Sequence, residues 1–218
     1  MTREEILHIC SDAETFADHF RRKLTAHKPQ SFVYRKDVPG IPAAVLFPFY
    51  FKEGQPYLLF TKRSNRVEHH KGQISLPGGQ KDETDADMLQ TALRETEEEI
   101  GLKANDVQIL GRADRFLTNT NYCVTPFVGM FSYPYPFRIS KAEIDYLIEV
   151  PLLHLLDENH YETKKASDNG TPWLLHYYYY GQEVIWGVTG FLLSDLFTIV
   201  FDMPRNRFLA QEVGAHVR

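Results

Sequence analysis

Large apolar side chains recur at helical spacing near the start of the chain, at Phe16, Phe20 and Leu24. A spacing of four residues places such side chains on one stripe of a helix. Capping-box pairs, in which a hydroxyl residue precedes glutamate by three positions, begin at Thr2 and Ser11. Pro29 closes the segment, because a helix rarely continues into the residue before proline. The pattern predicts helices over residues 2–27, with an apolar stripe that a second copy of the chain would cover in a homodimer.

Two apolar runs, residues 43–51 and 57–61, flank a turn at Gly54-Gln55-Pro56 and predict a β-hairpin. Asn169-Gly170 is a second typical hairpin turn, with an expected strand on each side. The full set of further strands is expected at 73–76, 107–110, 124–131, 150–152, 161–165, 173–180 and 183–186.

Three further helices are expected between these strands, each opened by a capping residue. The caps are Asp85, Ser140 and Thr189, and the helices are 85–100, 140–148 and 189–201. Gly101 ends the first of them, because glycine accepts the left-handed conformation that follows a helix. No long linker rich in proline, glycine or serine divides the chain. The elements therefore predict a mixed sheet with helices on its faces, an α/β sandwich.

The chain has 218 residues, a net charge of −5, and 24% charged and 43% hydrophobic residues, which is typical of globular proteins. Its acidic balance argues against nucleic-acid binding, which requires an excess of positive charge. The two cysteines, Cys10 and Cys123, cannot form a disulfide framework and favour a reducing compartment. No apolar segment is long enough to cross a bilayer. We therefore expect a cytoplasmic protein without a membrane or nucleic-acid partner, and any polyanionic substrate needs metal ions or a local basic patch.

Carboxylates gather on one face of the helix expected at 85–100. At 100° per residue, Glu95, Glu98 and Glu99 fall within roughly 100° of one another, and Glu97 points elsewhere. Like charges at this spacing repel, and the macrodipole disfavours them toward the end of a helix. A hard divalent cation such as Mg²⁺ would offset that cost, because it prefers oxygen ligands. The alternative interpretation is a solvated acidic face without a metal.

The context of this helix resembles the Nudix hydrolase family. A strand and the turn Gly78-Gly79 precede it, and residues 94–102, Arg-Glu-Thr-Glu-Glu-Glu-Ile-Gly-Leu, fill every fixed position of the family's helical motif. The resemblance implies a Nudix-like α/β/α sandwich with a mixed sheet and an N-terminal helical extension. One departure is a loop longer by one residue, with Asp85 in place of the usual glutamate, and we interpret Asp85 as the helix cap.

A subgroup of that family, the coenzyme A diphosphatases, is similar over a wider stretch. Residues 58–64, Arg66 and residues 72–79 fit the subgroup's additional motif, and the similarity covers about residues 40–190. We therefore divide the chain into an N-terminal helical extension, a Nudix domain and a C-terminal tail, at 1–30, 31–203 and 204–218. Lys62, Arg63 and Arg66 belong to a basic stretch that would hold the substrate's phosphates, although a solvated basic loop is the alternative.

The resemblance also implies a mechanism. Glu95, Glu98 and Glu99 would bind Mg²⁺ or Mn²⁺, and water would attack the diphosphate of coenzyme A to give 4′-phosphopantetheine and adenosine 3′,5′-bisphosphate. Arg94 would orient a glutamate, and Gly78 and Gly79 would let the backbone turn closely beneath the site.

The resemblance also implies a general base, which would be one of these glutamates or else Glu143 or Glu149. Two rival functions stay open: a diphosphatase for ADP-ribose or another nucleoside diphosphate derivative, and a Nudix fold that binds nucleotides without turnover.

Overall fold

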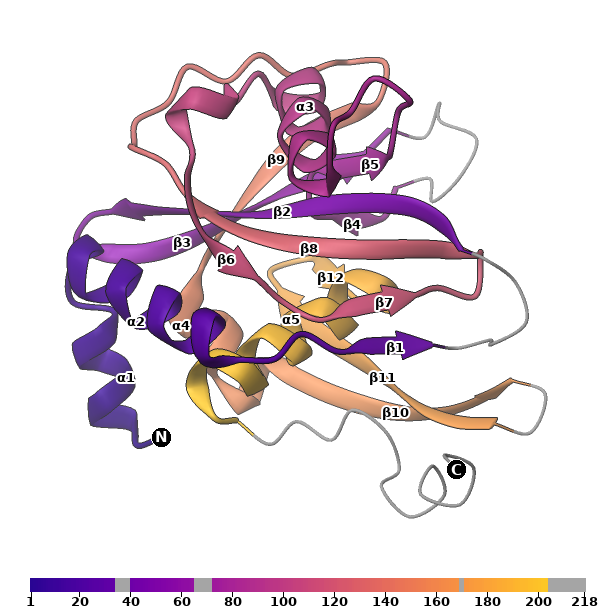
Figure 1. Ribbon diagram of the computed structural model, residues 1–218. Coiled ribbons are helices and arrows are strands. Elements are labelled where there is room, and N and C mark those ends of the chain that lie inside the picture. The colour runs from indigo at the N-terminus through magenta and orange to yellow at the C-terminus, as the bar shows by residue number, and fades with distance from the viewer. Residues whose placement is uncertain (34–39, 65–71, 169–170, 204–218) are drawn as a thin grey trace.

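A nine-stranded mixed sheet forms the centre of the molecule in the computed structural model, which describes residues 1–33, 40–64, 72–168 and 171–203 (Figure 1). Its strands are β1 Ser31–Val33, β2 Ile41–Lys52, β3 Gln55–Arg63, β4 Ile74–Ser75, β5 Gly78–Gln80, β6 Gln108–Arg112, β7 Arg115–Leu117, β8 Tyr122–Met130 and β9 Ile144–Pro151. Strand β2 pairs parallel with β8 and antiparallel with β3, so the predicted hairpin and the mixed sheet are both confirmed.

Helices cover both faces of this main sheet. Helix α3 (Met88–Ile100) lies on one face, which we call the upper face, and α2 (Ala13–Ala26) and α5 (Gly187–Phe201) lie on the lower face (Figure 1). Side chains of β2 alternate between the two: Leu46 and Tyr50 pack above, and Phe47 and Phe49 pack below. Because both faces are covered, β2 is apolar almost throughout rather than alternating. The arrangement confirms the α/β/α sandwich.

A second, three-stranded antiparallel sheet lies below the main sheet. It consists of β10 Tyr161–Asp168, β11 Thr171–Tyr180 and β12 Glu183–Ile185, and α5 packs against β11. The two expected arms of this hairpin are present and longer than predicted, and its turn at 169–170 lies outside the described residues. The short elements that complete the fold are α1 Arg3–Ile9, η1 Ala104–Asp106, α4 Leu152–Leu156 and η2 Glu158–His160.

The N-terminal segment forms two helices, α1 and α2, and the capping box at Thr2 is confirmed. The second cap is Asp12 rather than Ser11: its Oδ1 accepts from the backbone N–H groups of Glu14 and Thr15 at 3.0 and 2.9 Å. Ser11 Oγ instead donates to the carbonyl oxygen of His8 at 2.7 Å. An aspartate one residue later competes better for the N–H groups because its oxygen is charged.

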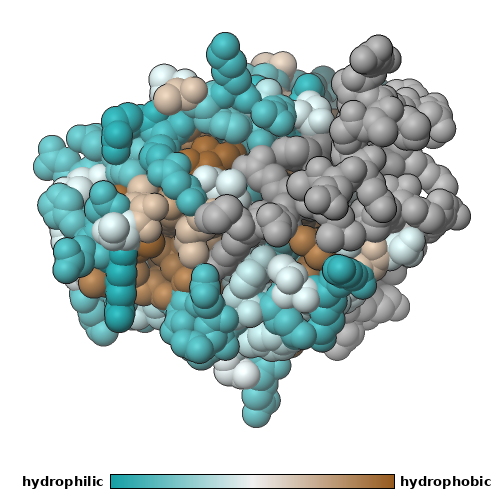
Figure 2. Space-filling view, turned by 90° about the horizontal axis from the view of Figure 1, so that it is seen from below, coloured by the Kyte–Doolittle hydropathy of each residue, from teal (hydrophilic) through white to brown (hydrophobic). Residues whose placement is uncertain are grey.

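The apolar stripe of α2 is covered by the chain itself. Phe16, Phe20 and Leu24 are buried in the core of the lower face, and the rings of Phe16 and Phe20 both contact Phe49 of β2. The expectation that a second copy covers this stripe is therefore wrong. Hydrophobic patches remain on the underside of the molecule between hydrophilic residues (Figure 2). The boundaries drawn at residues 30 and 203 stay predictions.

Two expected helix starts are also wrong. Residues 140–143 form a turn, and β9 follows in place of a helix because Ile144, Ile148 and Val150 alternate inward and pair with β3. The expected strand at 150–152 is the end of β9 and the beginning of α4. Helix α5 begins before Thr189, whose Oγ1 donates to the carbonyl oxygen of Ile74 at 3.2 Å and so ties α5 to β4.

Candidate active site

The acidic helix α3 lies over β2 and β5, where its length and both ends are fixed by specific residues. Asp87 caps its start by accepting from the backbone N–H of Gln90 at 2.8 Å, and Gly101 ends it in the left-handed conformation with φ 74°. The predicted end is confirmed. The predicted start is wrong, because Asp87 rather than Asp85 is the cap.

Asp85 is a buried anchor for Arg94. Its Oδ1 accepts from Arg94 Nε at 2.9 Å and its Oδ2 from Arg94 Nη2 at 3.0 Å, so the pair is bidentate. The hydroxyl of Thr91 and the backbone N–H of Asp82 also donate to Oδ2, each at 2.9 Å. The Arg94 guanidinium and these donors hold the pKa of Asp85 well below its usual range. Asp85 is therefore ionised at neutral pH and fixes the direction of Arg94.

The third nitrogen of this fixed guanidinium faces two of the predicted metal-binding carboxylates. Arg94 Nη1 lies 2.9 Å from Glu95 Oε1 and 3.1 Å from Glu98 Oε2. Charge-assisted contacts of this length restrict the rotamers of both glutamates. The geometry agrees with a role for Arg94 in orienting carboxylates rather than in contacting a substrate.

The three predicted metal ligands differ strongly in exposure. The side chains of Glu98, Glu95 and Glu99 are 59%, 19% and 2% exposed, respectively. Burial raises the pKa of Glu99 to about 8, although Arg63 Nη1 at 3.4 Å and the backbone N–H of Gly78 at 3.3 Å oppose the shift. Burial also raises the pKa of Glu95. A carboxylate in such surroundings gains from a nearby cation, which favours its charged form.

The strand β5 approaches α3 so closely that it requires glycine. A Cβ atom at Gly79 would lie 2.5 Å from the Glu95 carboxylate, and one at Gly78 would lie 2.3 Å from the carbonyl oxygen of Ala44. Gly78 also has φ +148°, which L side chains rarely adopt. Gly79 thus lets β5 pass close to Glu95, and Gly78 lets the same strand lie close to β2.

Lys62 and Arg63, which are adjacent near the end of β3, point to opposite faces of the sheet. Arg63 points up to Glu99, and its buried Nε has no hydrogen-bond partner within the described residues. Lys62 points down, where its Nζ lies 2.6 Å from Glu183 Oε2 of β12. The structure therefore brings Arg63, but not Lys62, to the carboxylates. Arg66 and the rest of the predicted basic stretch, 65–71, lie outside the described residues.

The two candidate bases outside the helix occupy different places. Glu143 is exposed at the end of the loop that crosses α3, where the backbone N–H of Ser140 donates to the carbonyl oxygen of Glu99 at 2.9 Å. The carbonyl oxygen of Glu143 accepts from Ser64, next to Arg63, at 2.7 Å. Its charge adds to the rise in the pKa of both Glu95 and Glu99. Glu149 instead pairs with Lys52, with 2.6 Å between Oε2 and Nζ.

The donor set suits a hard divalent cation. Glu95, Glu98 and Glu99 supply only carboxylate oxygens, the ligands that Mg²⁺ and Mn²⁺ prefer. Within the described residues, no three His, Cys, Asp or Glu side chains converge in metal-binding geometry. In this arrangement Arg94 Nη1 contacts two of the three glutamates, so both carboxylates would have to turn in order to hold an ion together with Glu99.

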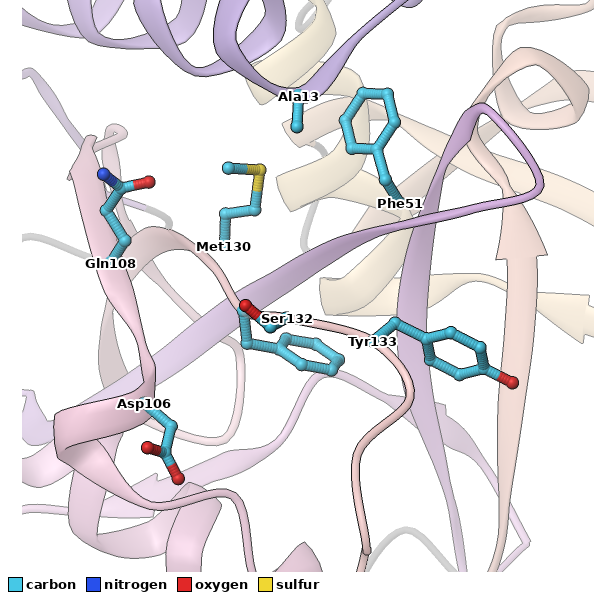
Figure 3. A pocket seen from close by; sticks show the side chains of 8 residues that line it. Ala13, Phe51, Asp106, Gln108, Met130, Ser132 and Tyr133 are labelled. Atoms are coloured by element: carbon cyan, nitrogen blue, oxygen red, sulfur yellow. The ribbon is translucent and has the colours of Figure 1, made fainter.

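A separate cavity of about 460 Å³ lies at the other end of β2. It is lined by Ala13, Phe51, Asp106, Gln108, Met130, Phe131, Ser132 and Tyr133 (Figure 3). Phe51 is six residues beyond the segment of β2 that pairs with β5, which is roughly 20 Å along a strand. No lysine or arginine lines the cavity, so it does not suit a polyanionic substrate. It is distinct from the carboxylate site.

Residues 40–145 match the model of the NUDIX domain. The chain is 34% identical over 182 residues to the uncharacterized Nudix hydrolase NudL of Escherichia coli O139:H28, covering 82% of this chain and 92% of that protein. It is 36% identical over 154 residues to NudL of Photorhabdus laumondii, covering 71% of this chain and 82% of that protein. The chain therefore belongs to the Nudix hydrolase family.

The fold is similar to that of a MutT/nudix family protein from Enterococcus faecalis, with a TM-score of 0.51. The match covers 90% of this chain and 77% of that protein at 13% identity, so it shows the fold alone. The described residues contain no helix long and apolar enough to cross a membrane.

Proposed function

We propose that this Nudix hydrolase cleaves the diphosphate of coenzyme A or its derivatives, giving 4′-phosphopantetheine and adenosine 3′,5′-bisphosphate. The observation that carries the proposal is the position of Arg63. It belongs to the stretch that resembles the coenzyme A diphosphatase motif, and it lies beside the buried Glu99 with its Nε unpaired within the described residues. A buried unpaired donor is costly, and a phosphate oxygen would satisfy it.

Glu95, Glu98 and Glu99 would hold Mg²⁺ or Mn²⁺ in this proposal. When bound, the ion neutralises the diphosphate oxygens and lowers the pKa of water. Arg94, fixed by Asp85, holds the glutamates in place, and Gly79 of β5 keeps the backbone close to Glu95. Arg63 and Arg66 remain the predicted phosphate contacts, whereas the pairing of Lys62 with Glu183 below the sheet argues against a phosphate contact for Lys62.

The proton of the attacking water needs an acceptor. Glu143 is favoured over Glu149, because it lies beside the carboxylates and no partner of its side chain is found among the described residues, whereas Glu149 is paired with Lys52. In the proposed step, Glu143 takes the proton while the water oxygen bonds to phosphorus. The bridging P–O bond breaks, and the leaving phosphate departs with its electron pair. The enzyme would act on this small molecule in the cytoplasm, without nucleic acid or membrane as a partner.

A substrate panel tests the proposal. Coenzyme A, its thioesters, ADP-ribose, NADH and diadenosine polyphosphates are compared by kcat/KM with Mg²⁺ and with Mn²⁺. We expect the highest value for coenzyme A or one of its derivatives. A higher value for ADP-ribose would favour the rival diphosphatase, and binding without turnover of any substrate would favour the non-catalytic module.

A further inference from the structure

The cavity at the far end of β2 has the size of a small-molecule site. Its volume of about 460 Å³ lies within the usual range for such sites, about 300 to 1,000 Å³. Residues of α2, β2, η1, β6 and β8 line it, together with the three residues that follow β8. Because most of its walls belong to helices and strands, the fold holds the side chains around it in defined positions.

The two sides of this cavity differ in chemistry (Figure 3). The side chains of Asp106 and Gln108 lie on one side, those of Phe51 and Tyr133 lie on the opposite side, and Met130 lies between them. The aromatic rings and the thioether offer apolar surface, and methionine adapts to ligands of different shape. A ligand that fits both sides therefore has an apolar body and a polar group at one end.

Asp106 is the one charged residue among the described residues that line the cavity. The hydroxyl of Tyr135 donates to its Oδ2 at 2.7 Å and so fixes the carboxylate, and no Lys, Arg or His in the described part of the chain pairs with it. Lys52 Nζ lies 5.3 Å from the centre of the Tyr133 ring, but it pairs with Glu149 at 2.6 Å. The uncompensated charge at the cavity is therefore negative and favours a cation.

We propose that this cavity binds a primary amine with an apolar body, such as an arylalkylamine. Its ammonium group lies at Asp106, and its apolar part lies against Phe51 and Met130. An ammonium group has three N–H donors, and the carboxylate of Asp106 and the side-chain oxygen of Gln108 are acceptors on the same side of the cavity. The proposal is independent of the catalytic function, because the cavity contributes no residue to the carboxylate site.

Methyl NMR on the full chain, labelled with ¹³C at the methionine methyl groups, tests the proposal. The chain has four methionines, and Met130 is the one that lines the cavity. The variant Met130→Leu assigns its signal. Three probes of similar size are titrated: phenethylamine, 2-phenylethanol and phenylacetate. Phenethylamine should move the Met130 signal saturably and bind about three- to fivefold more tightly than 2-phenylethanol, as for an exposed ion pair. Phenylacetate should bind most weakly.

Two variants separate the charge of the cavity from its shape. Asp106→Asn keeps the acceptor for Tyr135 but removes the charge, so the affinity for phenethylamine should fall about three- to fivefold and that for 2-phenylethanol should not change. Ala13→Leu fills part of the cavity and should weaken both probes. Asp145→Asn is the matched control: it removes an exposed aspartate at the other end of the sheet, next to the residue that pairs with Arg63, and should change neither affinity.

Three results would overturn the proposal: a Met130 signal that no probe moves saturably, equal affinities for phenethylamine and 2-phenylethanol, or an unchanged affinity for phenethylamine in Asp106→Asn. Circular dichroism checks that the variants are folded. If Ala13→Leu does not fold, Asp106→Asn still decides, because Asp106 is exposed. The measurement involves no turnover and no phosphate, so its outcome and that of the substrate panel are independent of each other.

Discussion

The two faces of the main sheet are built from different residues. The lower face holds a large aromatic core, in which Phe16, Phe20, Phe47, Phe49, Phe197 and Phe201 are fully buried. The upper face holds a smaller apolar cluster of Leu46, Tyr50, Leu59, Ile100, Leu102 and Phe131. Beside that cluster the upper face buries the carboxylates of Asp85 and Glu99. The lower face also buries a carboxylate, that of Asp195 in α5, but it holds none of the predicted metal ligands.

Because of this difference, we expect the two faces of the sheet to contribute differently to the stability of the fold and to the reaction. Burial of aromatic side chains stabilises the fold in proportion to the area removed from water. Burial of carboxylates costs free energy unless donors surround them, and Asp85 has such donors whereas Glu99 has fewer. Substitutions below the sheet should therefore change mainly stability, and substitutions above it mainly turnover.

The largest effect is expected for Phe20→Ala on the lower face. Phe20 contacts Phe16, Phe49 and Phe201, and its removal leaves a cavity in a packed core. We expect the free energy of unfolding to fall by about 3 to 5 kcal/mol. Chemical denaturation measures the change, and kcat per folded molecule should stay near the wild-type value. A loss below about 1 kcal/mol would mean that the core relaxes around the gap.

On the upper face, Glu98→Gln and Glu99→Gln should each lower kcat by at least about a hundredfold, or roughly 2.7 kcal/mol, because metal-assisted charge stabilisation is lost. Removing a carboxylate from a crowded cluster should change the unfolding free energy little. The matched control is Glu97→Gln, an exposed glutamate on the same helix but off the acidic face. Near wild-type turnover of Glu98→Gln and Glu99→Gln at saturating Mg²⁺ would refute the metal assignment.

The sequence predicted the elements with strong periodicity. The β2–β3 hairpin, the acidic helix with its end at Gly101 and the helices on both faces of the sheet are all present. It failed where one local signal had two explanations. Ser140 and Glu143 have the spacing of a capping box, but the alternating apolar residues that follow find partners in β3. Three-residue strands such as β1 and β7 carry too little pattern to be recognised.

Only part of the site could be predicted, because only part of it follows from a periodic pattern in the sequence. Helical geometry alone places Glu95, Glu98 and Glu99 on one face. The contact between Asp85 and Arg94 joins residues nine positions apart, one in a loop and one in a helix, so no periodic pattern in the sequence indicates it. We predicted Asp85 as the cap of this helix, and the fold shows that Asp87 caps it instead. The opposite directions of Lys62 and Arg63 follow from strand alternation once β3 is known to extend through residue 63.

Two variants, Arg66→Ala and Arg63→Ala, test the predicted phosphate contacts. If Arg66 contacts the 3′-phosphate, Arg66→Ala should lower kcat/KM for coenzyme A by roughly 10- to 150-fold, since a hydrogen bond to a charged group contributes about 1.5 to 3 kcal/mol. Dephospho-coenzyme A, which lacks that phosphate, should lose much less. Arg63 faces Glu99, so Arg63→Ala should lower kcat/KM similarly for both substrates. Equal losses for both substrates in Arg66→Ala would place Arg66 on the shared diphosphate or in support of the loop.

The smallest effect is expected for Lys62→Ala, which tests the division between the faces most directly. Lys62 adjoins Arg63 and belongs to the same predicted phosphate-binding stretch, yet it pairs with Glu183 below the sheet, and Tyr146 donates to that same carboxylate. We expect Lys62→Ala to lower the unfolding free energy by about 1 kcal/mol, as for a modest ion pair, and to leave kcat/KM within about twofold.

A double-mutant cycle with Glu183→Gln isolates the pair from other changes, because each single variant removes the same contact. The two stability losses should then be less than additive, and neither variant should change the preference for coenzyme A over dephospho-coenzyme A. A tenfold or larger fall in kcat/KM for Lys62→Ala, with the unfolding free energy unchanged, would show that Lys62 leaves Glu183 to bind the substrate. Two cations that adjoin in the sequence would then serve one site, and the sheet would not separate their roles.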